Sequence, residues 1–277
     1  MSMKQGTGGR RLDLRIATMS LIWGMLEPGN ISKWLRESAE AGYDGVTGFE
    51  SDFSPYLDDH ELLADTLREH GLALAGVDWR MNEDEKLYRR YFELMKALDC
   101  ALFVCIDPAG PKAAAGGAKD YAKLARSLNR VGSVAREYGI TVHYHNHTAA
   151  VGETLTDMER LIDETDPELV GIMLDLGHAT KDFTELAPPE RAVRFLEQYW
   201  ERLHYMELKD WNERTQLNTP LGEGHADYQR VFAMMKERGY SGWITVEQNG
   251  NDGASLGRTP LECAKISREF IRKGLGV

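Results

Sequence analysis

One local pattern recurs along the chain: a charged helical end, then a glycine, then an apolar stretch. It occurs around Gly42, Gly71, Gly139 and Gly239. A glycine just after a helix can take the left-handed conformation that ends the helix and turns the chain toward a strand. The spacing is 29 residues from Gly42 to Gly71 and 68 residues, twice 34, from Gly71 to Gly139. These are the lengths of strand and helix units, so the pattern predicts a chain of repeated βα units.

Hydrophobic periodicity places eight strands between helical patterns. We expect them near residues 14–20, 44–50, 72–78, 101–107, 140–146, 170–175, 203–209 and 243–248. Strands that alternate with helices without an intervening linker indicate one α/β domain, a (β/α)8 TIM barrel over residues 12–277, preceded by a flexible polar tail over residues 1–11. A doubly wound sheet is disfavoured because no glycine-rich phosphate turn follows the first strand.

Composition limits the partners that this chain can have. It has 33 basic and 44 acidic residues, for a formal charge of −11. Binding to nucleic-acid phosphates needs clustered Lys and Arg, so we expect no nucleic-acid partner and favour a small neutral or metal-chelated substrate. No apolar stretch reaches the roughly 18–20 residues of a membrane span, so we expect no membrane association. The sequence leaves the oligomeric state open, a homo-oligomer included.

The cysteines indicate the redox compartment. Cys100, Cys105 and Cys263 are odd in number and have no metal-ligand spacing. Two of them flank an apolar run, where cysteine behaves as a small hydrophobic residue. We therefore expect a reduced, cytoplasmic protein.

Polar residues gather where the later strands are expected to end. The fifth strand ends in histidines at 143, 145 and 147 that share one face, and the next three strands contribute Asp175, Glu207 and Glu247. The catalytic face of a barrel lies at these carboxyl ends. Three carboxylates and at least one imidazole at one mouth would need a cation between them. Oxygen-rich ligand sets suit Mg or Mn, and an imidazole admits Co or Zn, so the pattern predicts a divalent-metal site.

Five motifs in the second half of the chain follow one another in a specific order. They are Tyr-His-Asn-His at 144–147 with Glu-Thr at 153–154, Leu-Asp-Leu-Gly-His-Ala at 174–179, Glu-Leu-Lys-Asp at 207–210, Leu-Gly-Glu-Gly at 221–224 with Asp227, and Gly-Tyr-Ser-Gly-Trp-Ile-Thr-Val-Glu at 239–247. In this order and spacing they resemble the xylose isomerase-like TIM-barrel superfamily of sugar phosphate isomerases and epimerases. The likeness covers roughly residues 12–273 and is strongest from 140 to 248.

The resemblance implies a metal-ligand set. That superfamily commonly binds one divalent metal through Glu, Asp, His and Glu at the ends of strands five to eight. Here the fifth-strand position is His145 and the seventh-strand position is Glu207, so two ligands are exchanged while the inventory of side chains is unchanged. The implied ligands are His145, Asp175, Glu207 and Glu247, with Glu153 as a further ligand from a loop. Mn is the favoured ion, and Mg, Co and Zn are alternatives.

The resemblance also implies a function. The leading hypothesis is a metal-dependent isomerase or epimerase that acts on a small keto sugar or polyol through an enediolate. Glu247 would move the proton, and His145 or His147 would serve the opposite side, since an imidazole now stands at one of the two glutamate acid/base positions. The runner-up is a lyase of the inosose dehydratase type, because residues 144–147 and Glu153 look closer to that branch.

Two hypotheses come from other classes. An endonuclease of the related abasic-site branch would need several metals and a basic DNA groove, which the charge of −11 opposes. A metal-less sugar-binding pseudoenzyme would follow from the altered ligand positions.

The remaining candidates are substrate contacts, each with a structural alternative. His178 matches a superfamily histidine that touches substrate near the metal, or else it caps the following segment. Lys209 would bind a substrate oxygen or offset the carboxylates. Three tryptophans that follow strand ends would stack on sugar C–H surfaces or pack under loops, namely Trp23, Trp79 and Trp211. Glu50 and Asp107 also close strands and are further candidates.

Overall fold

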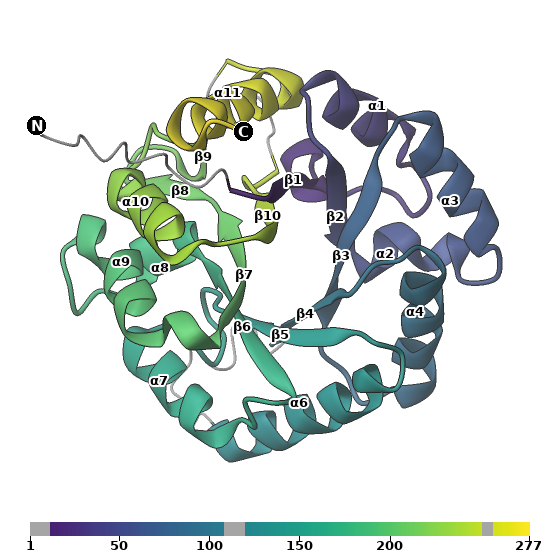
Figure 1. The fold of residues 1–277 in the computed structure, drawn as a ribbon, viewed down its shortest axis with the longest axis horizontal. Helices are drawn as coiled ribbons and strands as arrows, with labels where there is room; N and C mark the ends of the chain where they lie inside the picture. The colour runs from purple at the N-terminus through teal and green to yellow at the C-terminus, as the bar shows by residue number, and fades with distance from the viewer. Residues whose placement is uncertain (1–11, 108–119, 251–256) are drawn as a thin grey trace, which may run out of the picture.

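Eight parallel strands close into a barrel in the computed structural model, which describes residues 12–107, 120–250 and 257–277. The order around the barrel is β1-β10-β7-β6-β5-β4-β3-β2, with helices outside it (Figure 1). The strands are β1 Leu14–Met19, β2 Gly45–Phe49, β3 Ala73–Arg80, β4 Leu102–Ile106, β5 Thr141–His145, β6 Val170–Asp175, β7 Leu203–Leu208 and β10 Gly242–Val246. The predicted (β/α)8 barrel is confirmed, with each strand boundary within two residues of its expected place. The tail expected over residues 1–11 lies outside the described residues.

The helices form the outer ring in Figure 1. They are α1 Ser32–Glu40, α2 Glu50–Phe53, α3 His60–Glu69, α4 Glu85–Ala97, α6 Tyr121–Arg136, α7 Leu155–Glu164, α8 Leu176–Asp182, α9 Pro188–Tyr199, α10 Tyr228–Arg238 and α11 Pro260–Leu275, with 3-10 turns at Ser20–Trp23, Ser54–Tyr56 and Trp200–Arg202. The glycines that predicted the repeats all have positive φ: 85° at Gly42, 67° at Gly71, 75° at Gly139 and 66° at Gly239. Each therefore ends a helix in the left-handed conformation, as expected.

The sequence analysis did not predict a small two-stranded sheet after β7. Strands β8, Asp210–Asn212, and β9, Gln216–Thr219, pair antiparallel outside the barrel. Asp210 fixes their base, because its carboxylate accepts hydrogen bonds from the backbone N–H groups of Trp211, Gly222, Gly224 and Ala226.

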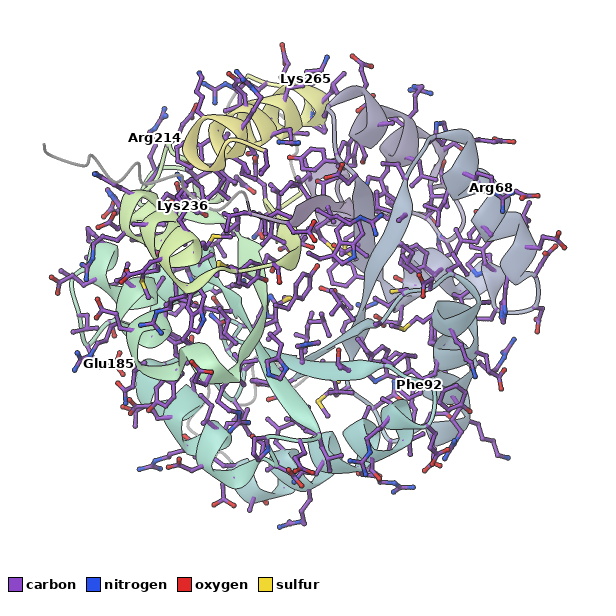
Figure 2. The ribbon with its side chains drawn as sticks, viewed as in Figure 1. Arg68, Phe92, Glu185, Arg214, Lys236 and Lys265 are labelled. Atoms are coloured by element: carbon purple, nitrogen blue, oxygen red, sulfur yellow. The ribbon has the colours of Figure 1, made fainter. Side chains whose placement is uncertain are left out.

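The main hydrophobic core lies between the barrel and the helices. Phe92 of α4 stacks edge-on against Phe103 of β4, with 4.8 Å between ring centroids. Figure 2 shows Phe92 between helix and barrel, whereas Arg68 and Lys265 lie on the periphery. Across the described residues, no helix is both long enough and apolar enough to span a membrane.

Side chains fill the amino-terminal half of the barrel interior. Val104, Met173 and Tyr205 form a second buried cluster there, and Trp243 packs against it. Gly45 makes room for Trp243, since a Cβ at this position would lie 2.6 Å from the indole. This part of the barrel interior is thus filled by packed side chains. The polar residues of the later strands lie nearer the carboxyl ends of the strands.

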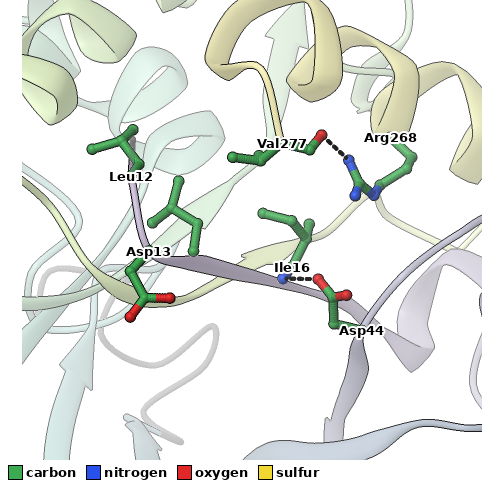
Figure 3. Close-up of a pocket in the computed structure, with 7 residues that line it drawn as sticks. Leu12, Asp13, Ile16, Asp44, Arg268 and Val277 are labelled. Carbon is green, nitrogen blue, oxygen red and sulfur yellow. Dashed lines mark hydrogen bonds between the residues drawn. The ribbon is translucent and has the colours of Figure 1, made fainter. Parts of the chain in front are cut away.

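A pocket of about 360 Å³ lies at the opposite, amino-terminal end of β1 (Figure 3). Two interactions brace its wall: the Ile16 N–H donates to Asp44 Oδ2 at 2.8 Å, and Arg268 Nη1 donates to the Val277 carbonyl at 3.0 Å. Leu12, Asp13 and Leu14 complete the lining. None of the expected metal ligands or acid/base residues lines this pocket, so it is separate from the site at the mouth.

Candidate metal centre and active site

Three consecutive strands bring His145, Asp175 and Glu207 together. Each residue points into the barrel, and Asp175 is the register partner of Glu207. His145 Nε2 lies 3.0 Å from Glu207 Oε2 and 3.6 Å from Asp175 Oδ2. All three side chains are buried, and one ligand atom from each lies within 4.8 Å of the others. We name these residues the first ligand group.

The donor set of the first ligand group suits a divalent cation. Asp175 Oδ1 accepts the His178 backbone N–H at 2.8 Å and so caps α8. Asp175 Oδ2 is buried without a hydrogen-bond partner. A buried carboxylate oxygen without a partner is costly unless a cation or a proton completes it. Asp175 is therefore a helix cap through one oxygen and offers the other to the mouth.

A second set of carboxylates adjoins the first. Ligand atoms of Asp78, Glu207 and Glu247 lie within 4.8 Å of one another, and all three side chains are buried. Asp78 belongs to β3, and its Oδ2 has no hydrogen-bond partner. We name these residues the second ligand group. Glu207 belongs to both groups, whereas Glu247, expected as a ligand beside His145, lies in the second.

Burial and mutual repulsion favour the protonated forms of these carboxyls. Burial, followed by repulsion from Glu247, holds the pKa of Asp78 and of Glu207 well above the usual range. Burial raises the pKa of Asp175 to about 6, although the Lys209 ammonium opposes this shift. A bound cation would lower these pKa values, because its positive charge favours the ionised carboxylates.

Lys209 is a cation inside this acidic mouth. Its side chain is 1% exposed, its Nζ lies 2.5 Å from Glu247 Oε1, and the same Nζ lies 3.5 Å from Asp175 Oδ2. Burial alone would lower the pKa of Lys209, but the carboxylates of Glu247, Asp175 and Glu207 outweigh burial and raise it. Lys209 is therefore an ammonium that offsets the carboxylates.

Thr148 contacts two histidines beside the first ligand group. Its backbone N–H donates to His178 Nδ1 at 3.3 Å, and its hydroxyl oxygen and Asp182 Oδ2 lie 3.0 and 3.4 Å from the same nitrogen. His178 Nε2 lies 3.7 Å from Asp175 Oδ2. The Thr148 carbonyl lies 2.8 Å from His147 Nδ1, which must donate and so leaves Nε2 of His147 with a lone pair. The two rings lie 4.2 Å apart. His147 can therefore accept a proton at Nε2.

The three mouth histidines form one cluster of neutral rings. The His145 ring lies 5.8 Å from His147 and 5.9 Å from His178. Burial is the first cause that lowers the pKa of each of the three, so near neutral pH they are uncharged. A neutral imidazole is the form that can take a proton or bind a metal.

Four other expected substrate contacts have hydrogen-bond partners within the protein. Glu50 accepts from Arg80 Nε at 3.0 Å, and Asp107 accepts the Val151 N–H at 3.0 Å. Trp23 donates to Glu37 at 2.6 Å, and Trp211 donates to Gln216 at 3.1 Å. Glu153 is half-buried and belongs to neither ligand group.

Trp79 packs in the hydrophobic core and does not face the barrel mouth. It lies within β3 with its indole fully buried, and it contacts Tyr88, Tyr91 and Phe103. Strand alternation explains this position, because Asp78 points into the barrel and the next residue must point out toward the helices.

Two residues of the site were not among the sequence candidates. Asp78 ends the expected third strand, so the rule applied to strands five to eight would have selected it. Asn146 exchanges two hydrogen bonds with the backbone of Asp175. No sequence signal identifies that pairing, because it depends on how β5 and β6 end side by side.

Comparisons with known proteins agree with the barrel fold. A sequence model described as xylose isomerase-like TIM barrel matches residues 35–274. An inosose dehydratase of Geobacillus kaustophilus is 28% identical over 274 residues, which cover 86% of this chain and 85% of that protein.

Two solved structures share the fold. D-allulose 3-epimerase from Methylomonas sp., in complex with D-allulose, has a TM-score of 0.71 at 20% identity and covers 95% of this chain and 97% of its own. The IolI protein with a bound zinc atom has a TM-score of 0.68 at 18% identity, and the match covers 95% of this chain and 98% of the IolI chain.

Proposed function

Because the chain belongs to the xylose isomerase-like TIM-barrel family, we propose that it is a divalent-metal-dependent isomerase or epimerase of a small keto sugar or polyol. One observation carries the proposal: a metal-ligand group, a carboxylate paired with an ammonium, and a cluster of neutral imidazoles meet at one barrel mouth. The related enzymes act on sugars and inososes, which supports a substrate that carries a carbonyl beside hydroxyl groups.

We assign the metal to the first ligand group. His145, Asp175 and Glu207 would hold it, and Asp175 Oδ2, which accepts no hydrogen bond, supports this assignment. A bound divalent ion polarises a carbonyl and stabilises negative charge on oxygen. Mn²⁺ is the ion we propose, and the zinc of the IolI protein makes Zn²⁺ the first alternative to test.

Glu247 is the proposed base. Its carboxylate takes the proton from the carbon beside the substrate carbonyl, and the electron pair moves to the carbonyl oxygen to give an enediolate. Lys209, 2.5 Å away, holds Glu247 in place. His178 donates from Nε2 to a substrate oxygen. Epimerisation then needs a proton on the opposite face. We assign its delivery to His147, whose Nε2 lone pair takes a proton from solvent before the transfer, because His145 is committed to the metal. Glu247 then ends protonated and His147 ends neutral.

An elimination is the second candidate, because the inosose dehydratase aligns with 86% of this chain. The first proton transfer is the same. The enediolate then expels the β-hydroxyl, and protonated Glu247 returns its proton to that oxygen, so that water leaves. Atoms and charges balance without an external reductant or oxidant.

A single assay separates these reactions. The Mn²⁺-loaded protein is incubated with ketohexoses, ketopentoses and keto-inositols in deuterated water, and the products are followed by NMR and mass spectrometry. Epimerisation gives an isomer with deuterium at one carbon and all hydroxyls retained. Loss of one water with a new conjugated carbonyl absorption identifies the dehydratase. If no carbon-bound proton exchanges with any of these substrates, the enediolate chemistry is wrong. The Glu247→Gln variant, nearly the same size, is the matched control and should show no exchange.

A further inference from the structure

We propose that Lys209 is a built-in cation that serves the second ligand group and thereby limits this mouth to one divalent ion. The inference rests on the proposed function only in assuming that the first ligand group binds a metal. It assigns a role to Asp78 and separates the two groups that share Glu207.

The second ligand group has the composition of a cation site in its own right. Asp78, Glu207 and Glu247 are 2%, 1% and 6% exposed, and their ligand atoms lie within 4.8 Å of one another. Asp78 Oδ2 is buried without a hydrogen-bond partner, so one oxygen of this group is still available. Two sites that share a bridging carboxylate are a familiar arrangement for paired divalent ions.

Lys209 contacts one member of this group directly. Its Nζ lies 2.5 Å from Glu247 Oε1 and 3.5 Å from Asp175 Oδ2, so it touches one carboxylate of each ligand group. Among the described residues, the only buried Lys or Arg side chains are Lys209 and Arg191, and Arg191 bonds carbonyl groups of residues 180, 181 and 186 instead.

Packing holds the Lys209 side chain in this position. Gly177, in the first turn of α8, leaves the space that the lysine stem fills, because a Cβ there would lie 2.7 Å from Lys209 Cγ. The Lys209 carbonyl accepts from Tyr228 Oη at 2.9 Å. A buried stem with little freedom places the ammonium at low entropic cost.

Charge favours one divalent ion when the lysine is present. The two groups contain four carboxylates, Asp78, Asp175, Glu207 and Glu247. With the ammonium and one divalent ion, the ionised site carries a net charge of −1. Without the ammonium, one divalent ion leaves −2 and a second gives neutrality. Removing Lys209 should therefore admit a second ion, held by Asp78, Glu207 and Glu247.

The test is the number of Mn²⁺ ions bound per chain, measured by calorimetric titration and by elemental analysis. Wild type should bind one ion. Lys209→Met should bind two, with a low-temperature electron paramagnetic resonance spectrum of an exchange-coupled pair, because Glu207 bridges them. Adding Asp78→Asn to Lys209→Met should return the count to one and remove the coupled signal. Lys209→Arg, which keeps the positive charge, should stay at one ion.

Lys181→Met is the matched control, because Lys181 contacts Thr148 and Asp182 rather than either ligand group, and it should bind one ion. Lys209→Gln replaces Lys209→Met if the methionine variant does not fold by circular dichroism. Two ions in wild type, or one ion in the neutral lysine variant at any affinity, would overturn the inference. If wild type binds no ion, the proposed metal-dependent function fails as well. If wild type binds one ion and the neutral variant also binds one, only the role of Lys209 fails.

Discussion

Asn146 and Asp175 exchange two hydrogen bonds across the ends of neighbouring strands. Asn146 Nδ2 donates to the Asp175 carbonyl at 3.0 Å, and the Asp175 backbone N–H donates to Asn146 Oδ1 at 2.8 Å. Both side chains are buried. The amide thus fixes the backbone of a proposed metal ligand just where β6 ends and α8 begins.

Replacing Asn146 with alanine should destabilise the protein. The change leaves a buried N–H and a buried carbonyl of Asp175 unpaired, which should lower the free energy of unfolding by about 2–5 kcal/mol. Urea denaturation followed by circular dichroism measures this loss. Asn82→Ala is the control: Asn82 accepts the Asp84 N–H on an exposed turn and should cost about 0.5 kcal/mol or less. Equal losses in the two variants would contradict the structural role of Asn146.

Chelation should lower the melting temperature. A metal that binds only the folded protein stabilises it by about 2.7 kcal/mol when present at 100 times its dissociation constant, which corresponds to about 5 to 10 °C for a chain of this size. Calorimetric scans with excess Mn²⁺ and with EDTA measure the difference. Asp175→Asn in the same scans should respond little to either. Identical wild-type scans would argue against a metal held by the first ligand group.

His178 should contribute to catalysis and not to metal binding. It belongs to neither ligand group, and we propose that its Nε2, 3.7 Å from Asp175 Oδ2, donates to a substrate oxygen. His178→Gln should therefore lower kcat/KM by about 10²-fold, as the loss of a preorganised donor does. Its Mn²⁺ affinity should stay within about threefold of wild type, since no ligand is removed. His70→Gln, at the far end of α3, is the control. A large loss of Mn²⁺ affinity in the His178 variant would make His178 a ligand instead.

Trp79 and Trp211 had the same two alternatives in the sequence analysis, but their alanine variants should differ in stability. Trp79→Ala empties a fully buried aromatic site and should cost about 3–5 kcal/mol of stability. Trp211→Ala, on the half-buried β8 strand, should cost about 1 kcal/mol or less. Thermal and urea unfolding measure both. If Trp211 stacks on substrate, its variant should also show a raised KM, whereas a comparable loss of stability in both variants would contradict the assignment of Trp79 to the core.

The repeating part of the fold was predictable from sequence because its signals are local. The glycines at 42, 71, 139 and 239 end helices through their own φ angles, so no tertiary context was needed. The β8 and β9 strands carried no comparable signal. They depend on Asp210, whose carboxylate collects N–H groups from residues up to 16 positions away.

The mouth was predictable only in part. Strand alternation places Asp175, Glu207 and Glu247 on the inner face, and the structure has them there. Alternation does not decide which carboxylates share a cation. Glu247 shares a ligand group with Asp78, because both side chains project toward Glu207 from other strands. The stagger of strands around a closed barrel sets such neighbours, and it is not encoded in the residues of one strand.

The exchanged ligands His145 and Glu207 give the most direct test of a shared metal, since their side chains lie 3.0 Å apart. Counted with Asp175, the ligand charge of the first ligand group is −2. His145→Glu alone changes it to −3, and Glu207→His alone changes it to −1, so each should alter Mn²⁺ affinity. The double exchange restores −2 and the order of ligands that the family resemblance implies. Its affinity should therefore lie closer to wild type than that of at least one single variant, provided that the surrounding hydrogen bonds tolerate the change. Turnover need not recover, because the acid/base group has moved. Calorimetric Mn²⁺ binding across the four proteins gives the coupling energy, and strictly additive losses would mean that the two residues do not share a metal.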